Sequence, residues 1–259
     1  MRQLLDLMSY RELIYHFTVR RVRARFKQSA LGMSWLVLHP VANVVVLTVV
    51  FSYIAKTPSE GIPYPLFSFG ALIPWVFFSS SVSMGIPSLT NNPNLVTKIY
   101  FPREILPISA IISVCFDTMI SALIFVVLLL IYKVQLTLYA FLVIPVVIID
   151  FIFSLGFVLL LATMNVWYRD AAQASTIMMQ FWMYLTPVIY PLSMVPKQFM
   201  PFYVLNPMVG IVEGFRSALL KGAMPDMTLL GISGVISIFT FVIGYTVFKS
   251  KEFDFADVI

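Results

Sequence analysis

Six long apolar stretches constrain the fold of this chain more than any other feature of its sequence. A helix that crosses a bilayer needs about 20 mostly apolar residues, because the hydrocarbon layer is about 30 Å thick. Hydrophobic residues make up 60% of the 259 residues and charged residues only 11%, a balance that a soluble core of this size does not accommodate. The sequence therefore predicts an all-α integral membrane protein.

The predicted membrane-spanning helices cover Trp35–Ala55, Leu66–Leu89, Ile105–Tyr132, Leu138–Asn165, Ala171–Tyr190 and Leu229–Phe248. Glycines and prolines interrupt the second span, so we expect its ends to be kinked or irregular. The stretch Phe199–Leu220 is half apolar but too polar and too often broken for a full crossing, and it favours a re-entrant or interfacial helix pair before the last span. We expect one membrane domain over residues 1–259, divided into 1–34, the six-span region 35–248 and a tail, 249–259.

Basic residues predict the orientation. Seven of them precede the first span, and more follow the second, fourth and sixth spans, so these segments are expected on the cytoplasmic side. Both termini are then cytoplasmic, and Phe199–Leu220 faces the outer side. Nucleic acid is not an expected partner, because this placement of charge is explained by membrane topology.

The segment before the first span predicts a helix that lies on the membrane surface. Tyr15, Val19, Val22 and Phe26 share one helical face, and basic residues flank it. Charge alone, without this periodicity, would indicate only a topology signal. We therefore expect residues 1–34 to contain a cytoplasmic amphipathic helix.

Two carboxylates fall near the middle of predicted spans, Asp117 in the third and Asp150 in the fourth. Acids at this depth can mark proton relays. However, Ser109, Ser113, Asp117 and Ser121 recur every four residues, which favours a packing seam between helices. No lysine or arginine within the spans is an obvious counter-charge, and we expect packing rather than proton transport.

The fifth predicted span carries a polar stripe, Gln173, Thr176, Gln180 and Tyr184, at helical spacing. Polar groups in hydrocarbon are costly, so the stripe needs water, another helix or a passing polar substrate. Taken alone it favours a helix–helix seam, because amides and hydroxyls also join membrane helices.

Motifs of enzyme chemistry are missing from the sequence. The chain has no GxxxxGK[ST] phosphate loop and no GxSxG nucleophile turn, and His16 and His39 are too far apart for a local metal pair. Transport is therefore favoured over catalysis, and no metal site is expected. Active transport would draw its energy from an ion gradient or from another polypeptide.

Several motifs, in this order, resemble the membrane subunit of type-2 ABC exporters, specifically the permeases that export O-antigen or teichoic acid. They are Ser29–Trp35 (SALGMSW) with Pro40, Gly70–Trp75 (GALIPW), Asn94–Pro107 (NLVTKIYFPREILP), Asn165–Asp170 (NVWYRD), Thr186–Pro191 (TPVIYP) and Asn206–Met208 (NPM). The resemblance covers nearly the whole chain. Its most specific part is Asn94–Pro107, on the cytoplasmic loop between the second and third spans.

The resemblance implies a permease of the cytoplasmic (inner) membrane without an ATPase domain. Two copies would pair with two ATP-binding subunits that hold ATP and Mg²⁺, and this chain would bind no cofactor. The loop at Asn91–Arg103 would dock into a cleft of the ATPase. The residues expected at this contact are Asn94, Lys98, Tyr100, Phe101 and Arg103, with Arg169 and Asp170 of the following cytoplasmic loop.

The resemblance also places the first and fifth spans around a conduit for sugar. Trp35, His39 and Asn43 recur every four residues in the first span, as Gln180 and Tyr184 do in the fifth. Aromatic faces can stack on sugar rings, and amides can bond their hydroxyls; interfacial anchoring is an equal explanation for Trp35. The expected substrate is a lipid-linked polysaccharide. The alternatives are a drug or other-lipid exporter of the same fold and a proton-coupled carrier that uses Asp117 and Asp150.

Overall fold

The computed structural model describes residues 10–27 and 31–259, and all regular structure in these ranges is helical. Three residues used in the predictions above lie outside the described residues. They are Arg2, one of the seven basic residues before the first span, and Ser29 and Ala30 of the SALGMSW motif. Five helices are long and apolar enough to cross a membrane, namely Gly32–Ile54, Tyr64–Ser88, Ile105–Ile131, Leu138–Trp167 and Met227–Val258. Five of the six predicted spans are therefore confirmed, with ends shifted by a few residues except in the last, which extends to Val258 instead of Phe248.

The main helices within these spans are α3 (Trp35–Leu47), α4 (Tyr64–Gly85), α6 (Ile105–Ile131), α7 (Val143–Trp167) and α11 (Met227–Lys251). The helix α3 continues in wider π-type turns to Ile54. As predicted, α4 ends irregularly, passing at Gly85 into a short 3-10 turn, although it runs on through Pro74.

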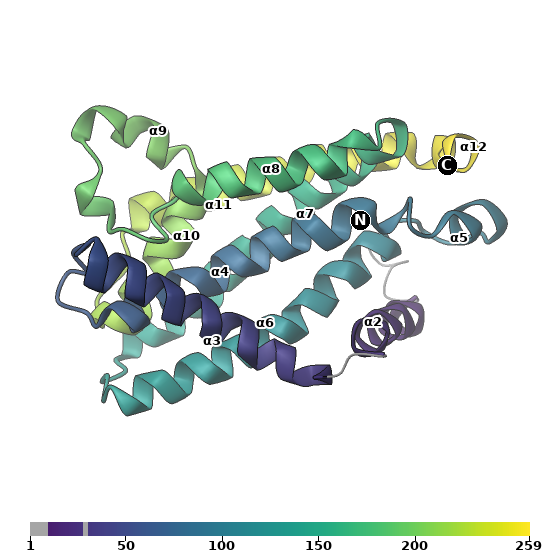
Figure 1. Cartoon of the computed structure of the whole chain (residues 1–259). Coiled ribbons are helices and arrows are strands. Elements are labelled where there is room, and N and C mark those ends of the chain that lie inside the picture. The colour runs from purple at the N-terminus through teal and green to yellow at the C-terminus, as the bar shows by residue number, and fades with distance from the viewer. Residues whose placement is uncertain (1–9, 28–30) are drawn as a thin grey trace.

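The remaining predicted span is the short helix α8 (Asp170–Tyr184), with 15 residues. At a rise of about 1.5 Å per residue it is roughly 22 Å long, less than the hydrocarbon layer. Figure 1 nevertheless shows α8 running lengthwise along the bundle, as α11 does. A membrane crossing by α8 remains a prediction.

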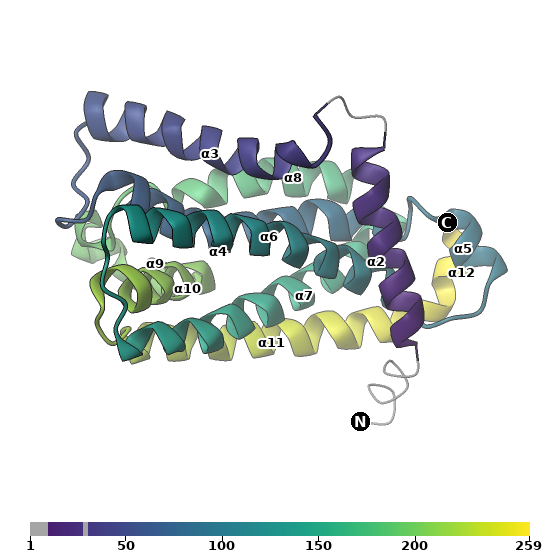
Figure 2. The same ribbon diagram turned by 90° about the horizontal axis from the view of Figure 1, so that it is seen from below.

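Two ends of the bundle are distinguished by the short helices that they carry. The α5 end holds α5 (Pro93–Lys98), α12 (Phe255–Val258) and α2 (Arg11–Phe26), and Figure 2 shows α2 lying across the long helices there. The α10 end holds α9 (Met200–Val204) and α10 (Pro207–Arg216), followed by π-type turns to Lys221. The broken stretch before the last long helix is thus a pair of short helices that stays at one end, as its prolines and glycines predict.

The core of the bundle is α4, whose residues are mostly buried and which contacts α6, α7, α10, α3 and α8. The most extensive helix pair is α7 with α11. Glycines permit its close approach, because a Cβ atom added at Gly244 would collide with the carbonyl oxygen of Gly156, and one added at Gly156 with the backbone of Phe241. The α3 helix is mostly exposed and packs lightly on α4 and α6.

Gly244→Ala should destabilise the bundle, because the new methyl group has no space and must push α11 away from α7. Overpacking of this kind costs about 1–3 kcal/mol. We expect a lower Tm of the purified protein in detergent. Gly231→Ala is the matched control on the same helix, since nothing lies within 4 Å of a Cβ there; equal Tm values for the two variants would contradict the close approach.

Candidate functional site

The helix α2 occupies the seam on α6 that the sequence predicts. The hydroxyl of Thr18 donates to the carbonyl of Ser109 at 3.5 Å, and the guanidinium of Arg25 forms an ion pair with Asp117. The counter-charge of Asp117 therefore comes from outside the predicted spans, from a residue 92 positions away in the sequence. Asp117 serves the packing of α2 on α6, in agreement with the preference for a seam.

The face of α2 that packs on the protein is formed by Leu13, Ile14 and Phe17, which join the cluster around Phe101. The predicted apolar face lies on a different side of the helix, and its Tyr15 is exposed. The side chain of Phe26 lies outside the described residues. The predicted contact of this face with lipid headgroups remains a prediction.

A cavity of about 300 Å³ opens between α2, α3, α4 and α6. Its lining includes Trp35, His39 and Asn43 of α3, so the structure brings together the three conduit residues predicted on the first span. Nδ2 of Asn43 lies 3.4 Å from Nδ1 of His39. Arg25 and Asp117 also line the cavity, which was not anticipated.

The conduit residues predicted on α8 do not reach this cavity. Gln173, Thr176, Gln180 and Tyr184 all lie on an exposed face of α8, and Tyr184 is 63% exposed. The opposite face of α8 packs inward through Met179 and Trp182. Within this chain the polar stripe is therefore not a seam, and it needs water, a second protein surface or a substrate beside it.

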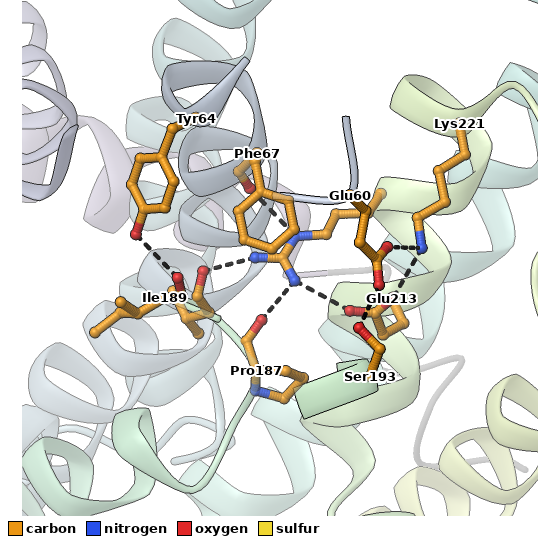
Figure 3. Close-up of polar contacts among 10 residues, drawn as sticks. Glu60, Tyr64, Phe67, Pro187, Ile189, Ser193, Glu213 and Lys221 are labelled. Carbon is orange, nitrogen blue, oxygen red and sulfur yellow. Dashed lines mark hydrogen bonds and ion pairs between the residues drawn. The ribbon is translucent and has the colours of Figure 1, made fainter. Parts of the chain in front are cut away.

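An arginine at the α10 end holds the irregular backbone that follows α8. The side chain of Arg216 is fully buried, and its guanidinium donates to the carbonyls of Pro187 at 2.6 Å, Val188 at 2.6 Å and Phe67 at 3.2 Å. The Phe67 ring also lies 3.6 Å from its Cζ atom (Figure 3). The next carbonyl, that of Ile189, accepts from the hydroxyl of Tyr64 at 2.9 Å.

Carboxylates complete this cluster. Glu213 Oε1 lies 3.0 Å from Nη1 of Arg216, and Lys221 bridges Glu213 and Glu60 at 3.6 and 2.8 Å (Figure 3). The hydrogen bond from Lys221 lowers the pKa of Glu60. Sequence reasoning placed Arg216 only within the broken stretch Phe199–Leu220 on the outer side, because nothing local indicates that an arginine is buried.

Two asparagines of the quoted motifs join segments that are distant in the sequence. Asn206 caps α10 by accepting from the backbone of Met208 at 3.1 Å, and it also accepts from Nε1 of Trp182 at 3.0 Å and donates to Thr186 at 3.0 Å. Asn165 donates to Thr90 at 3.0 Å and accepts from the backbone of Ala172 at 3.1 Å. These motifs therefore fix the two ends of α8.

The predicted coupling loop is divided into exposed and buried parts. Asn94, Lys98 and Tyr100 are exposed, Tyr100 by 93%, whereas Phe101 is only 6% exposed. The prediction that Phe101 is presented outward is wrong, because its ring packs beside that of Phe17 of α2, with centroids 6.2 Å apart.

Two further predicted coupling residues, Arg169 and Asp170, lie exposed at the same end, where α8 begins. Asp170 stands in the first turn of α8, where a carboxylate favours the helix dipole. Arg103 is half-buried and points back to the C-terminal segment, where it bonds Glu252.

Asp150 is buried among α7 and its neighbours, and its nearest described hydrogen-bond partner is the hydroxyl of Ser154 at 3.5 Å. The alternative of a proton-coupled carrier that uses Asp117 and Asp150 is less favoured, because Asp117 is engaged by Arg25 of α2. Among the residues that the structure describes, no cluster of three or more His, Cys, Asp or Glu side chains could hold a metal ion.

A family model described as ABC-2 type transporter matches residues 12–220. The chain belongs to this family. It is 29% identical over 257 residues to an O-antigen export system permease protein, RfbA, of Myxococcus xanthus, with 98% of each chain covered. An RfbA of Klebsiella pneumoniae is 25% identical, with 96% of this chain and 95% of the relative covered. The polysialic acid transport protein KpsM of Escherichia coli is 25% identical, with 90% and 91% covered.

As an ABC-2 family member the chain is a multi-pass membrane protein, and the matched region ends four residues after Arg216. The long helices before α11, the coupling loop and Arg216 thus belong to the shared family region, whereas α11 lies outside it. The C-terminal segment beyond α11 also lies outside the matched residues. Its Glu252 accepts a hydrogen bond from the backbone of Arg103.

Arg216→Lys should destabilise the protein, although it keeps the charge. An ammonium group cannot reproduce the planar fork that reaches Pro187 and Val188 together. A buried carbonyl that loses its donor costs about 1–3 kcal/mol, and we expect a lower Tm in detergent. Lys197→Arg, at an exposed position, is the matched control. If Arg216→Lys and this control had the same Tm, the planar guanidinium of Arg216 would not be needed for stability.

Proposed function

We propose that this chain is the permease subunit of an ABC exporter that carries a lipid-linked polysaccharide, of O-antigen or teichoic-acid type, across the cytoplasmic membrane. The observation that carries the proposal is near full-length similarity to relatives named for O-antigen export and polysialic acid transport. Similarity to KpsM as well as to RfbA favours a polysaccharide as the substrate class. Residues 1–259 act as one permease domain.

A separate ATP-binding subunit supplies the energy in this proposal and holds ATP and Mg²⁺. The complex contains two permeases and two such subunits, and this chain has no catalytic role. The ATP-binding subunit docks at the α5 end. The exposed Asn94, Lys98 and Tyr100, with Arg169 and Asp170, are available for this contact.

The α5 end faces the cytoplasm. Eleven basic residues of the described chain lie on helices and loops of that end, and five on those of the α10 end, in accord with the positive-inside rule. The eleven are Arg11, Arg20, Arg21, Arg23, Arg25, Lys27, Lys98, Arg103, Arg169, Lys249 and Lys251; the five are Lys56, Lys133, Lys197, Arg216 and Lys221. Both termini are then cytoplasmic.

The conduit is completed by the second copy of the chain. Gln180 and Tyr184 are exposed on α8, while Trp35, His39 and Asn43 line a cavity on α3. Because the two sets do not meet within one protomer, pairing of two protomers would enclose the polar face of α8 and give a sugar chain a lining of rings and amides.

Transport assays separate this function from the alternatives. Inverted membrane vesicles that contain the permease with its ATP-binding partner should take up radiolabelled lipid-linked glycan when ATP is added, and uptake should persist when an ionophore collapses the ion gradients. Uptake that follows the gradient without ATP would support a proton-coupled carrier. ATP-driven uptake of a dye or phospholipid in place of the glycan would support a drug or other-lipid exporter.

Tyr184→Ala should impair glycan export without unfolding the protomer, because its side chain is 63% exposed. A lost stacking contact of about 1 kcal/mol corresponds to a roughly fivefold weaker interaction with a sugar. Export rate, Tm and dimer content are measured on one set of variants. Phe239→Ala, at 65% exposure on α11, is the control. Normal export beside a loosened dimer would instead assign Tyr184 to a seam between the two copies.

A further inference from the structure

Two segments far apart in the sequence are joined at the α5 end. The backbone N–H of Arg103, the last residue of the coupling loop, donates to Oε1 of Glu252 at 2.8 Å. The Arg103 guanidinium donates to the backbone carbonyl of Glu252 and, at 3.4 Å, to that of Val96 in α5. Arg103 thus connects the coupling loop to the C-terminal segment through both its backbone and its side chain.

Glu252 is held in turn by a buried ion cluster. Nζ of Lys249 lies 2.8 Å from Oε2 of Glu252 and 2.6 Å from Oε1 of Glu104, and Glu104 is only 1% exposed. Burial raises the pKa of Glu104, and the hydrogen bond from Lys249 opposes that rise. Removal of one member of a buried ion cluster is costly, because the remaining charges stay out of water. The position of Glu252 is therefore fixed by α6 and α11 together.

The segment after Glu252 is anchored by aromatic packing. Phe255 of α12 is fully buried, and its ring meets Phe248 with centroids 5.2 Å apart and Trp167 with centroids 5.6 Å apart. The helix α12 also packs against α5. The C-terminal segment is therefore built into the same unit as the coupling loop.

The outer surface of this unit carries exposed apolar side chains beside exposed polar ones. Ile99 is 53% exposed, Tyr100 93% and Phe253 76%, and the three line one cavity of about 330 Å³. The polar residues Arg103, Glu104, Lys249 and Glu252 line the same cavity. Exposed aromatic side chains around a polar, partly enclosed site are typical of the centre of a protein interface.

We infer that the C-terminal segment, residues 252–258, forms part of the docking surface for the ATP-binding subunit, with Phe253 as a contact and Glu252 as a positioning residue for Tyr100. This inference rests on the proposed function, because it places the same partner on Phe253 as on the coupling loop. Phe253 and Tyr100 line the same cavity. The hydrogen bond between Arg103 and Glu252 holds together the two segments that carry them.

The contact is tested on the complex of the permease with the ATP-binding subunit that copurifies with it. Phe253→Ala should weaken binding about tenfold or more, as truncation of an aromatic interface residue does, and it should leave the Tm of the isolated permease unchanged because the ring is exposed. Phe202→Ala, at 72% exposure on the α10 end, is the matched control and should bind as wild type. Tyr100→Ala is made in parallel.

Three results have distinct meanings. If Tyr100→Ala weakens binding while Phe253→Ala matches Phe202→Ala, the inference fails and the proposed docking of the coupling loop stands. If neither variant weakens binding, docking at the α5 end fails as a whole. If both weaken binding at unchanged Tm, the shared surface is supported.

The positioning role is tested by a double-mutant cycle. Glu252→Gln should lower the permease-stimulated rate of ATP hydrolysis several-fold, and Arg103→Gln should do the same. The double variant should be no worse than either single variant, because the side chains of Arg103 and Glu252 hold the same junction between the two segments. The positioning role of Glu252 would be overturned if the losses of ATP hydrolysis rate in the two single variants added up in the double variant. It would also be overturned if Glu252→Gln left the rate unchanged while Arg103→Gln lowered it.

Discussion

The buried guanidinium of Arg216 is the interaction on which the α10 end of the structure depends. After α8 the backbone leaves helical form, and the carbonyls of Pro187, Val188 and Ile189 lose their helical donors. Unsatisfied backbone groups away from water cost several kcal/mol each, so irregular backbone at membrane depth is tolerated only where protein groups replace the lost bonds. Arg216 serves the first two carbonyls and Tyr64 the third, while Glu213 compensates the buried charge.

The short length of α8 follows from the same arrangement. Because Arg216 and Asn206 bind the chain just beyond Tyr184, α8 ends early and α10 is fixed against α4, α7 and α11. Asn206 joins the first turn of α10 to the last turn of α8 through Trp182. A movement of α8 at this end would therefore have to carry α10 with it, which makes the α10 end one mechanical unit.

Sequence reasoning predicted the helical class, five of the spans and the broken segment before α11, because hydropathy and helix breakers act locally. It also placed Trp35, His39 and Asn43 together, since their spacing determines a shared face of α3. It missed the pairs Arg25–Asp117 and Arg216–Pro187 and the burial of Phe101. Each of these depends on which distant segment packs against the residue, and no local pattern carries that information. A fully buried arginine is rare, so the residue type of Arg216 argued against its burial.

The two ends of the bundle are built differently, and this difference bears on how the chain can work. At the α10 end a buried charge holds irregular backbone in place, whereas at the α5 end α2, α5 and α12 are joined by aromatic packing and ion pairs. Between them α4 is enclosed on most sides, while α3 and α8 leave exposed faces. Force applied at the α5 end would reach α6 through Arg25 and Glu104 and α7 through Asn165, since these side chains connect the end helices directly to the spans. The loosely held α3, with few buried residues to resist displacement, is then the helix most free to move relative to this frame.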